Sequence, residues 1–164
     1  MANPLANESL VPSVLDRLLD DDPTTTRETP KARTQVLREL KQSVRRDLEC
    51  LLNTRWRCRG WPEDLDQLEL SLLNYGLPDL VEVDLQSAAG RGQFQRILEK
   101  VIRHFEPRFK SIRVEVLKNA SPLDHTVRFR IDAVLYAEPA PEPVMFDSSL
   151  EPATGNVEVR GTRT

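Results

Sequence analysis

Glu106 and Arg108 stand on either side of Pro107, and their types and spacing suit a fixed charged contact. A proline disfavours helical geometry in the residue before it and offers no N–H, so Glu106 should have an extended backbone. Residues two apart then share one side of the backbone, which places the carboxylate beside the guanidinium. Either the two side chains form a plain surface ion pair, or they bind a partner protein. We expect the pair to be exposed and to contribute only about 0–1 kcal/mol to folding.

Other reactive residues are few. Cys50 and Cys58 lie eight residues apart without a Cys-x-x-Cys motif, and only His104 and His125 are available to assist them as ligands. This spacing argues against a metal site. The sequence also contains no Ser/His/Asp set and no phosphate-binding loop, so we expect no enzymatic activity, no cofactor and no small-molecule substrate.

The charge is segregated along the chain although the net value is only −3. Residues 31–59 hold nine basic and three acidic residues, whereas residues 60–90 hold seven acidic residues and no Lys or Arg. Arginines around Trp56 invite a nucleic-acid interpretation, but the acidic block and a pI near 5.5 argue against it. Most of these charges suit a solvated surface. We expect some of them to mark protein interfaces, and we expect no nucleic-acid partner.

The elements that must position the corner are predicted from hydrophobic periods. Helical spacing predicts helices from about residue 34 to 59, ending at Gly60, and over 93–105. Alternation predicts strands over 109–118 and 127–135, and a hairpin from 144–146 to 157–159 around Gly155 and Asn156. The expected fold class is α+β: a small single domain with two or three helices packed on an antiparallel sheet of about four strands.

Three regions are expected. Residues 1–33 are an N-terminal arm and linker, residues 34–137 the α+β core domain, and residues 138–164 a proline-rich spacer and terminal β-hairpin. The hairpin either extends the sheet or lends an edge to a neighbouring protein. Within the arm, Ser13 can cap a short helix whose apolar stripe is formed by Val14, Leu15, Leu18 and Leu19. A helix this short is unstable alone, so the stripe should dock on the chain's own core or on another protein.

The chain has no apolar run near the roughly 20 residues that a membrane-spanning helix needs. Its first residues, Met1 to Pro4, lack the basic and apolar regions of a signal peptide. We therefore expect a cytoplasmic protein without direct membrane insertion.

Four stretches in order together resemble the TssE family of type VI secretion baseplate subunits, which is related to contractile-phage baseplate wedge proteins. They are the arm from Ser13 to Leu18, residues 44–49 running into 51–55, the turn Asn74-Tyr75-Gly76-Leu77-Pro78-Asp79, and Glu106-Pro107-Arg108. The resemblance extends from about residue 10 to residue 160, and no motif position departs from the family's pattern. Four ordered motifs are far more specific than any one of them.

The resemblance implies a structural subunit of the cytoplasmic baseplate wedge, assembled with TssF, TssG and TssK. It also implies a position where the contractile TssB/TssC sheath begins. The family's Glu-Pro-Arg triplet is its wedge-contact motif. That role falls on Glu106 and Arg108, with Pro107 fixing the backbone between them, and the terminal hairpin is expected to meet sheath strands.

An alternative comes from relatives that have been labelled lysozyme-like, namely a glycoside hydrolase acting on peptidoglycan. Such an enzyme needs two carboxyl groups, one of which keeps its proton at neutral pH to act as a general acid. Arg108 beside Glu106 would favour the ionised carboxylate instead. Peptidoglycan also lies outside the cytoplasm, so the sequence favours a structural protein over an enzyme.

Overall fold

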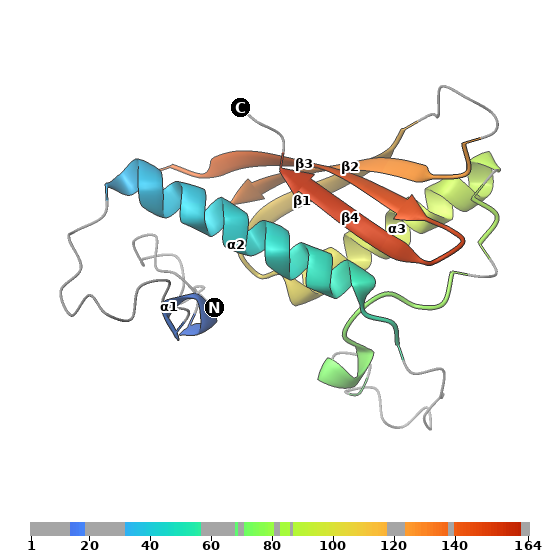
Figure 1. Cartoon of the computed structure of the whole chain (residues 1–164), viewed down its shortest axis with the longest axis horizontal. Coiled ribbons are helices and arrows are strands. Elements are labelled where there is room, and N and C mark those ends of the chain that lie inside the picture. The colour runs from blue at the N-terminus through green and yellow to red at the C-terminus, as the bar shows by residue number, and fades with distance from the viewer. Residues whose placement is uncertain are drawn as a thin grey trace.

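A four-stranded antiparallel sheet in the order β1-β2-β3-β4 forms one layer of the computed structural model (Figure 1). The structure describes residues 14–18, 32–56, 68, 71–80, 83–85, 87–117, 124–137 and 140–161. Its strands are β1 (Phe109–Val116), β2 (Val127–Leu135), β3 (Glu142–Glu151) and β4 (Asn156–Gly161). Two long helices, α2 (Arg33–Asn53) and α3 (Ala88–Phe105), form the second layer. The predicted α+β class is confirmed.

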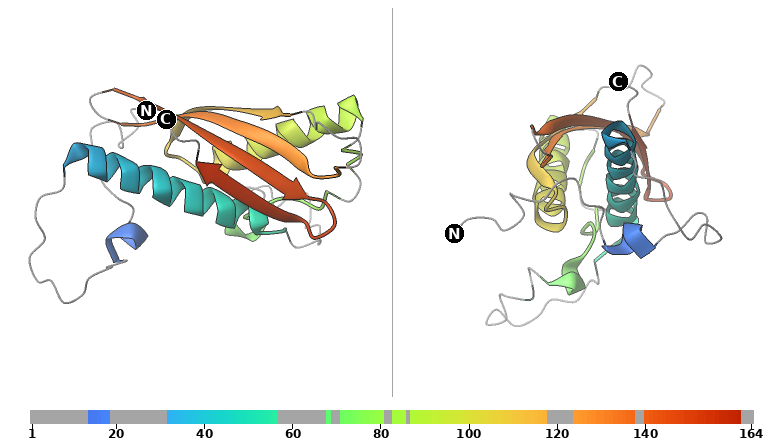
Figure 2. Two further views of the ribbon diagram at one scale, coloured as in Figure 1. Left: turned by 45° about the horizontal axis from the view of Figure 1, so that its top comes forward. Right: turned by 90° about the vertical axis from the view of Figure 1, so that its left-hand side faces the viewer.

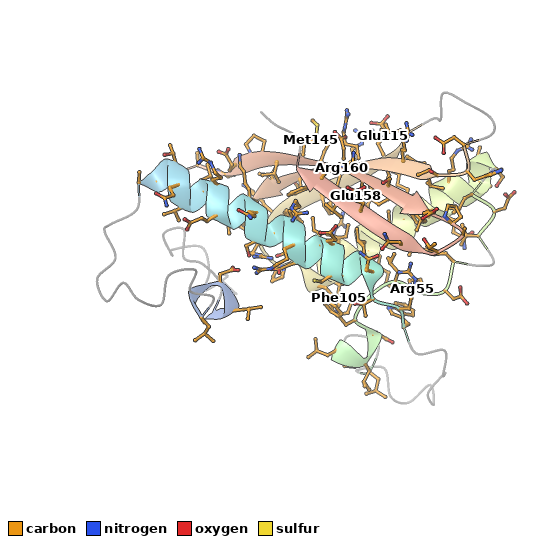
Figure 3. The ribbon with its side chains drawn as sticks, in the orientation of Figure 1. Arg55, Phe105, Glu115, Met145, Glu158 and Arg160 are labelled. Atoms are coloured by element: carbon orange, nitrogen blue, oxygen red, sulfur yellow. The ribbon has the colours of Figure 1, made fainter. Side chains whose placement is uncertain are left out.

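Both long helices cover the same face of the sheet (Figure 2). The alternation predicted for β2 is confirmed, because every second side chain from Val127 to Leu135 is buried against them. Phe129 of this strand meets Phe94 of α3 edge to face, with ring centroids 5.6 Å apart. On the other face, Glu115 and Met145 point away from the helices (Figure 3), and Arg130 pairs with Asp147 at 2.9 Å. One apolar and one polar face explain the two-layer fold.

Helix α2 ends at Asn53, so its predicted continuation to residue 59 is wrong for residues 54–56, while 57–60 lie outside the described residues. Thr54 has an extended backbone, and its carbonyl accepts a hydrogen bond from the Leu77 N–H at 2.8 Å. Pairing with a segment more than twenty residues away therefore replaces the next helical turn. Helix α3 begins at Ala88, earlier than predicted, because the Ser87 hydroxyl accepts from the Gly90 N–H at 2.9 Å as an N-cap.

The terminal hairpin extends the sheet, which was one of its two predicted roles. Strand β3 is longer than predicted and begins at Glu142, inside the proline-rich stretch. Gly155 has φ +69° in the predicted turn. Buried residues of β3 and β4 complete the core, namely Val144, Phe146, Leu150, Val157 and Val159.

Two short elements lie beyond the helix layer, α1 (Val14–Leu18) and the 3₁₀ helix η3 (Leu72–Asn74). Figure 2 shows α1 beside α2, on the side away from the sheet. None of the helices among the described residues has the length and apolar character needed to cross a membrane.

Candidate functional site

The corner between α3 and β1 is a tight turn built around Pro107. The Glu106 N–H donates the last helical hydrogen bond to the Ile102 carbonyl at 2.9 Å, and Glu106 itself leaves helical geometry with φ −119° and ψ 81°. The Phe109 N–H then donates to the Glu106 carbonyl at 3.3 Å, where β1 begins. Pro107 is exposed at the tip, while the side chains of Glu106 and Arg108 turn inward.

Glu106 and Arg108 form a two-point ion pair. The Arg108 Nε donates to Glu106 Oε1 at 2.6 Å and its Nη2 to Oε2 at 2.5 Å. The Arg108 backbone N–H also donates to Oε1, at 3.2 Å. The predicted pairing is therefore present. The predicted exposure is wrong, because the Glu106 side chain is only 6% exposed and that of Arg108 24%. Docking of the corner against α2 buries Glu106 and covers most of the Arg108 side chain.

Arg108 also joins the corner to α2. Its Nη2 lies 2.6 Å from Asp47 Oδ2, and its Nη1 donates to the Ser43 hydroxyl at 3.1 Å. Burial alone would lower the pKa of Arg108, but its hydrogen bonds to Glu106 and Asp47 and their charges outweigh burial, so its pKa lies above the ordinary value. The guanidinium thus stays charged and bridges two carboxylates from two elements.

This network joins two of the four motifs noted in the sequence, the one that contains Asp47 and the Glu-Pro-Arg triplet. A family model described as baseplate wedge protein gp25 matches residues 38–140, which include both. The chain belongs to the baseplate wedge protein gp25 family. TssE belongs to the same family. A search of curated proteins and a search of solved structures gave no significant match. Membership makes this gp25-family chain a structural baseplate protein with protein partners in a baseplate.

The arm of this gp25-family chain enters the same network through Asp16 of α1. Asp16 Oδ2 accepts from the Ser43 hydroxyl at 2.6 Å, and Oδ1 accepts from Arg46 Nη2 at 2.6 Å. The bond to Asp16 is the main cause that raises the pKa of Arg46. Ser43 is thus the junction between α1 and Arg108. We call Asp16, Ser43, Arg46, Asp47, Glu106 and Arg108 the corner network.

The described apolar residues of the arm are exposed to solvent and lie outside the corner network. The side chains of Leu15 and Leu18 are 57% and 74% exposed, whereas the Asp16 side chain between them is only 14% exposed. The side chain of Val14 and all of Leu19 lie outside what the structure describes. Helix α1 therefore contacts the core through a carboxylate, while Leu15 and Leu18 stay exposed.

Sequence reasoning missed four members of the corner network, namely Asp16, Ser43, Arg46 and Asp47. Two signals were available for them. Arg46 and Asp47 are the charged centre of a motif that carries the family resemblance, and Asp16 is a lone carboxylate within the apolar stripe of the arm.

The motif of residues 44–55, which spans the end of α2, attaches the helix to the outer edge of β4. The Asn53 carboxamide donates to the Val157 carbonyl at 2.7 Å and accepts from the Val157 N–H at 2.8 Å, as a neighbouring strand would. Arg45 Nη1 donates to the Val159 carbonyl at 3.0 Å, and Arg55 Nη2 donates to the Gly155 carbonyl. Side chains of and just beyond α2 therefore bond two carbonyls of the β4 edge and one of the turn before it.

The Asn74–Asp79 motif packs against the same helix end. Gly76 has φ +112°, and a Cβ there would lie 2.3 Å from the Thr54 carbonyl oxygen, so only glycine fits. Its own carbonyl accepts from the Trp56 indole N–H at 2.6 Å. These contacts hold the segment after α2 in the extended course that ends the helix.

Among the described residues, β1 has no strand on its outer side, and the start of β3 is a second open stretch of the sheet. On β1, the Val114 N–H donates to Glu99 Oε1 of α3 at 2.9 Å. On the other side, β4 pairs only with Phe146–Glu151, so Glu142 to Met145 of β3 have no described neighbour there. Beside this open edge lies a hollow of about 1120 Å³, lined by Lys41 and Arg45 of α2 and by Val144 and Phe146 of β3.

The charged groups of the corner network make structural contacts. The described residues contain no group of three or more His, Cys, Asp or Glu side chains arranged to hold a metal ion. Both Glu106 oxygens accept hydrogen bonds from Arg108, which leaves this carboxylate committed within the protein. The arrangement is suited to holding three chain segments together.

Proposed function

We propose that this protein is the TssE subunit of a type VI secretion system, a structural part of the cytoplasmic baseplate wedge that links the wedge to the base of the contractile sheath. One observation carries the proposal: the Glu106–Arg108 pair is locked by Asp47 and Ser43 to α2, so the family's motif residues form one rigid unit. The proposed partners are TssF, TssG and TssK in the wedge and TssB/TssC in the sheath.

The proposed wedge surface combines the tip of the corner with the arm. Pro107 is exposed, and the half-exposed Arg46 and Asp47 lie between it and α1. Leu15 and Leu18 add two exposed apolar side chains next to these charged residues. An apolar anchor surrounded by polar groups is the usual anatomy of a specific protein interface. In this arrangement Arg108 acts as a positioning residue, because its guanidinium nitrogens already bond within the chain.

The proposed sheath contact is the open edge of β3. The backbone groups of Val157 and Val159 face α2, on the side of β4 away from β3. Their partners in the strand register, Leu150 and Ser148, therefore form no backbone hydrogen bonds with β4. By alternation, Met145 and Pro143 direct their backbone groups to the open edge. Pro143 offers no N–H, which leaves Met145 as the donor. An added sheath strand would place alternate side chains in the neighbouring hollow.

The wedge half of the proposal is tested by binding of purified TssF–TssG. The double change Leu15→Ser and Leu18→Ser should weaken binding by about tenfold or more, because each exposed leucine that a partner buries contributes about 1.5–3 kcal/mol. The melting temperature should stay within a few degrees of that of the wild type. Leu72→Ser is the matched control, since Leu72 is 81% exposed and lies on η3. Absence of binding by the wild-type chain, together with normal secretion in a deletion strain, would refute the proposal.

A further inference from the structure

Two neighbouring rows of register partners face the core beside the open edge of β3. One row crosses all four strands, through Val114, Ile131, Phe146 and Gly161. The other row ends at β3, with Ile112, Ala133 and Val144. Since β4 ends at Gly161, no described residue continues the second row beyond Val144. The hollow of about 1120 Å³ lies here, because residues of both rows line it.

Gly161 leaves part of this hollow empty. It lines the hollow and is the register partner of Phe146, and directly opposite residues of paired strands share one face of a sheet. A Cβ at position 161 would meet no atom within 4 Å, and Gly161 is not one of the glycines with positive φ. A larger residue would therefore fit at this position without backbone strain, and its side chain would be directed into the hollow.

The two cations that α2 contributes to the lining are already paired. Lys41 Nζ lies 2.9 Å from Glu142 Oε1, and Arg45 Nη1 donates to Glu49 Oε2 at 3.1 Å and to the Val159 carbonyl at 3.0 Å. Their charges are thereby satisfied within the chain, and their carbon stems are what remains to cover the hollow. The hollow is therefore suited to an apolar side chain and not to an acidic one.

The backbone of β3 determines the conformation of an occupant. Met145 directs its N–H and carbonyl to the open edge, so an extended segment pairs there and places one residue directly opposite Val144. That residue faces the core and enters the hollow. The other charged lining residues, Arg113 and Asp132, belong to the outer face of the sheet by alternation. Pockets of roughly 300–1,000 Å³ take up drug-sized ligands, so the hollow has room for a large side chain.

We propose that the sheath strand that adds to β3 carries a large apolar side chain opposite Val144, and that Gly161 determines this specificity by leaving the hollow empty. This proposal rests on the sheath contact of the proposed function and adds the chemistry of the residue that the site accepts.

Gly161→Leu tests the proposal by placing a leucine in the hollow. Sedimentation of TssB/TssC with reconstituted wedges should show recruitment that is weaker by about tenfold or more, because the side chain of the added strand loses its space. Arg160→Leu is the matched control, since alternation directs the same side chain to the outer face of β4. It should change recruitment less than about twofold. Gly161→Ala provides a milder variant if the leucine unfolds the chain.

The melting temperature of the isolated chain reports on the hollow without any partner. Gly161→Leu should raise it by a few degrees more than Gly161→Thr does, because a leucine that enters the hollow buries more apolar surface. The threonine variant controls for the loss of glycine's flexibility in the unfolded chain. Equal melting temperatures of the two variants would overturn the proposal, since position 161 would then not reach the hollow.

Two further results would overturn the proposal. The first is undiminished recruitment of TssB/TssC by Gly161→Leu when Met145→Pro prevents recruitment, which leaves the proposed sheath contact intact. The second is recruitment that is about tenfold tighter for a chain ending at Gly161 than for the full chain, which would make residues 162–164 the occupant. Absence of recruitment by the wild-type chain would instead refute the sheath contact itself, and this proposal with it.

Discussion

The guanidinium of Arg108 bonds to residues of its own chain, which gives the Glu-Pro-Arg triplet a role in folding. It bridges Glu106 of the corner and Asp47 of α2, with Ser43 as a third partner. An exposed ion pair contributes little to folding, but removal of one member of a buried pair leaves the other charge desolvated. The triplet therefore contributes first to folding of the corner, and we propose that it serves assembly only through that fold.

Arg108→Ala should lower the free energy of unfolding by about 3 kcal/mol, because it strands the buried Glu106 carboxylate. For a domain of this size, the melting temperature should fall by roughly 10 °C. The stability of Arg108→Lys should lie between those of Arg108→Ala and the wild type, since an ammonium cannot reproduce the two-point contact. Urea denaturation measures both. Arg38→Ala is the control, and an Arg108→Ala protein as stable as this control would contradict the buried network.

At the scale of elements, α1 is held to α2 by a carboxylate. Asp16 contacts Ser43 and Arg46, while Leu15 and Leu18 face outward. This orientation explains how a five-residue helix, too short to persist alone, keeps an apolar pair displayed.

Asp16→Asn should release α1, because a neutral amide gives up the charge-assisted bond to Arg46. Limited proteolysis within residues 1–31 should become several-fold faster, while the core retains its cooperative unfolding. Truncation of residues 1–22 should likewise spare the core fold. Asp132→Asn, on the outer face of the sheet, serves as the control. An arm cleaved at the wild-type rate in the Asp16 variant would show that other contacts hold it.

The end of α2 acts as a substitute strand along β4. Asn53 satisfies both backbone groups of Val157, and Arg45 and Arg55 satisfy two further carbonyls. Side-chain hydrogen bonds along an outer edge protect it against non-specific pairing with strands of other molecules.

Asn53→Ala should lower stability by about 1–3 kcal/mol, through two lost hydrogen bonds and an unpaired Val157 backbone. Hydrogen exchange at the Val157 amide should accelerate more than exchange at Val127–Leu135. Gln93→Ala, which removes an exposed amide from α3, is the matched control. Unchanged exchange at Val157 would mean that the contact with Asn53 does not protect this edge.

On the scale of the whole molecule, the two proposed assembly surfaces lie in different layers. Helix α1 lies outside the helix layer, and the open edge of β3 belongs to the sheet (Figure 2). In the proposed function, the two-layer core between these surfaces would connect the wedge to the sheath. Separate surfaces also predict separable defects.

Met145→Pro should impair the start of sheath assembly without weakening TssF–TssG binding, because it removes the N–H that faces the open edge. Met145→Leu keeps the N–H and should behave as wild type. Sedimentation of TssB/TssC with reconstituted wedges measures the effect. Normal sheath assembly by the proline variant would exclude strand addition at this edge.

The sequence by itself determined the local geometry of this protein. The change of hydrophobic period at Pro107, the alternation of β2 and the turn at Gly155 predicted the helix-to-strand corner, the sheet and the hairpin, because periods of 3.6 and 2 report which side of an element is buried. Ordered motifs also indicated the family.

Only the tertiary structure decided how distant polar groups meet. The partners of Ser43 lie 27 and 65 residues away along the chain, and the partner of Asn53 lies 104 residues away. Such contacts depend on how α2 lies across the sheet, and no local period encodes that placement. Burial of Glu106 and the early end of α2 follow from the same packing, since docking against α2 covers the corner and pairing with Leu77 replaces a helical turn.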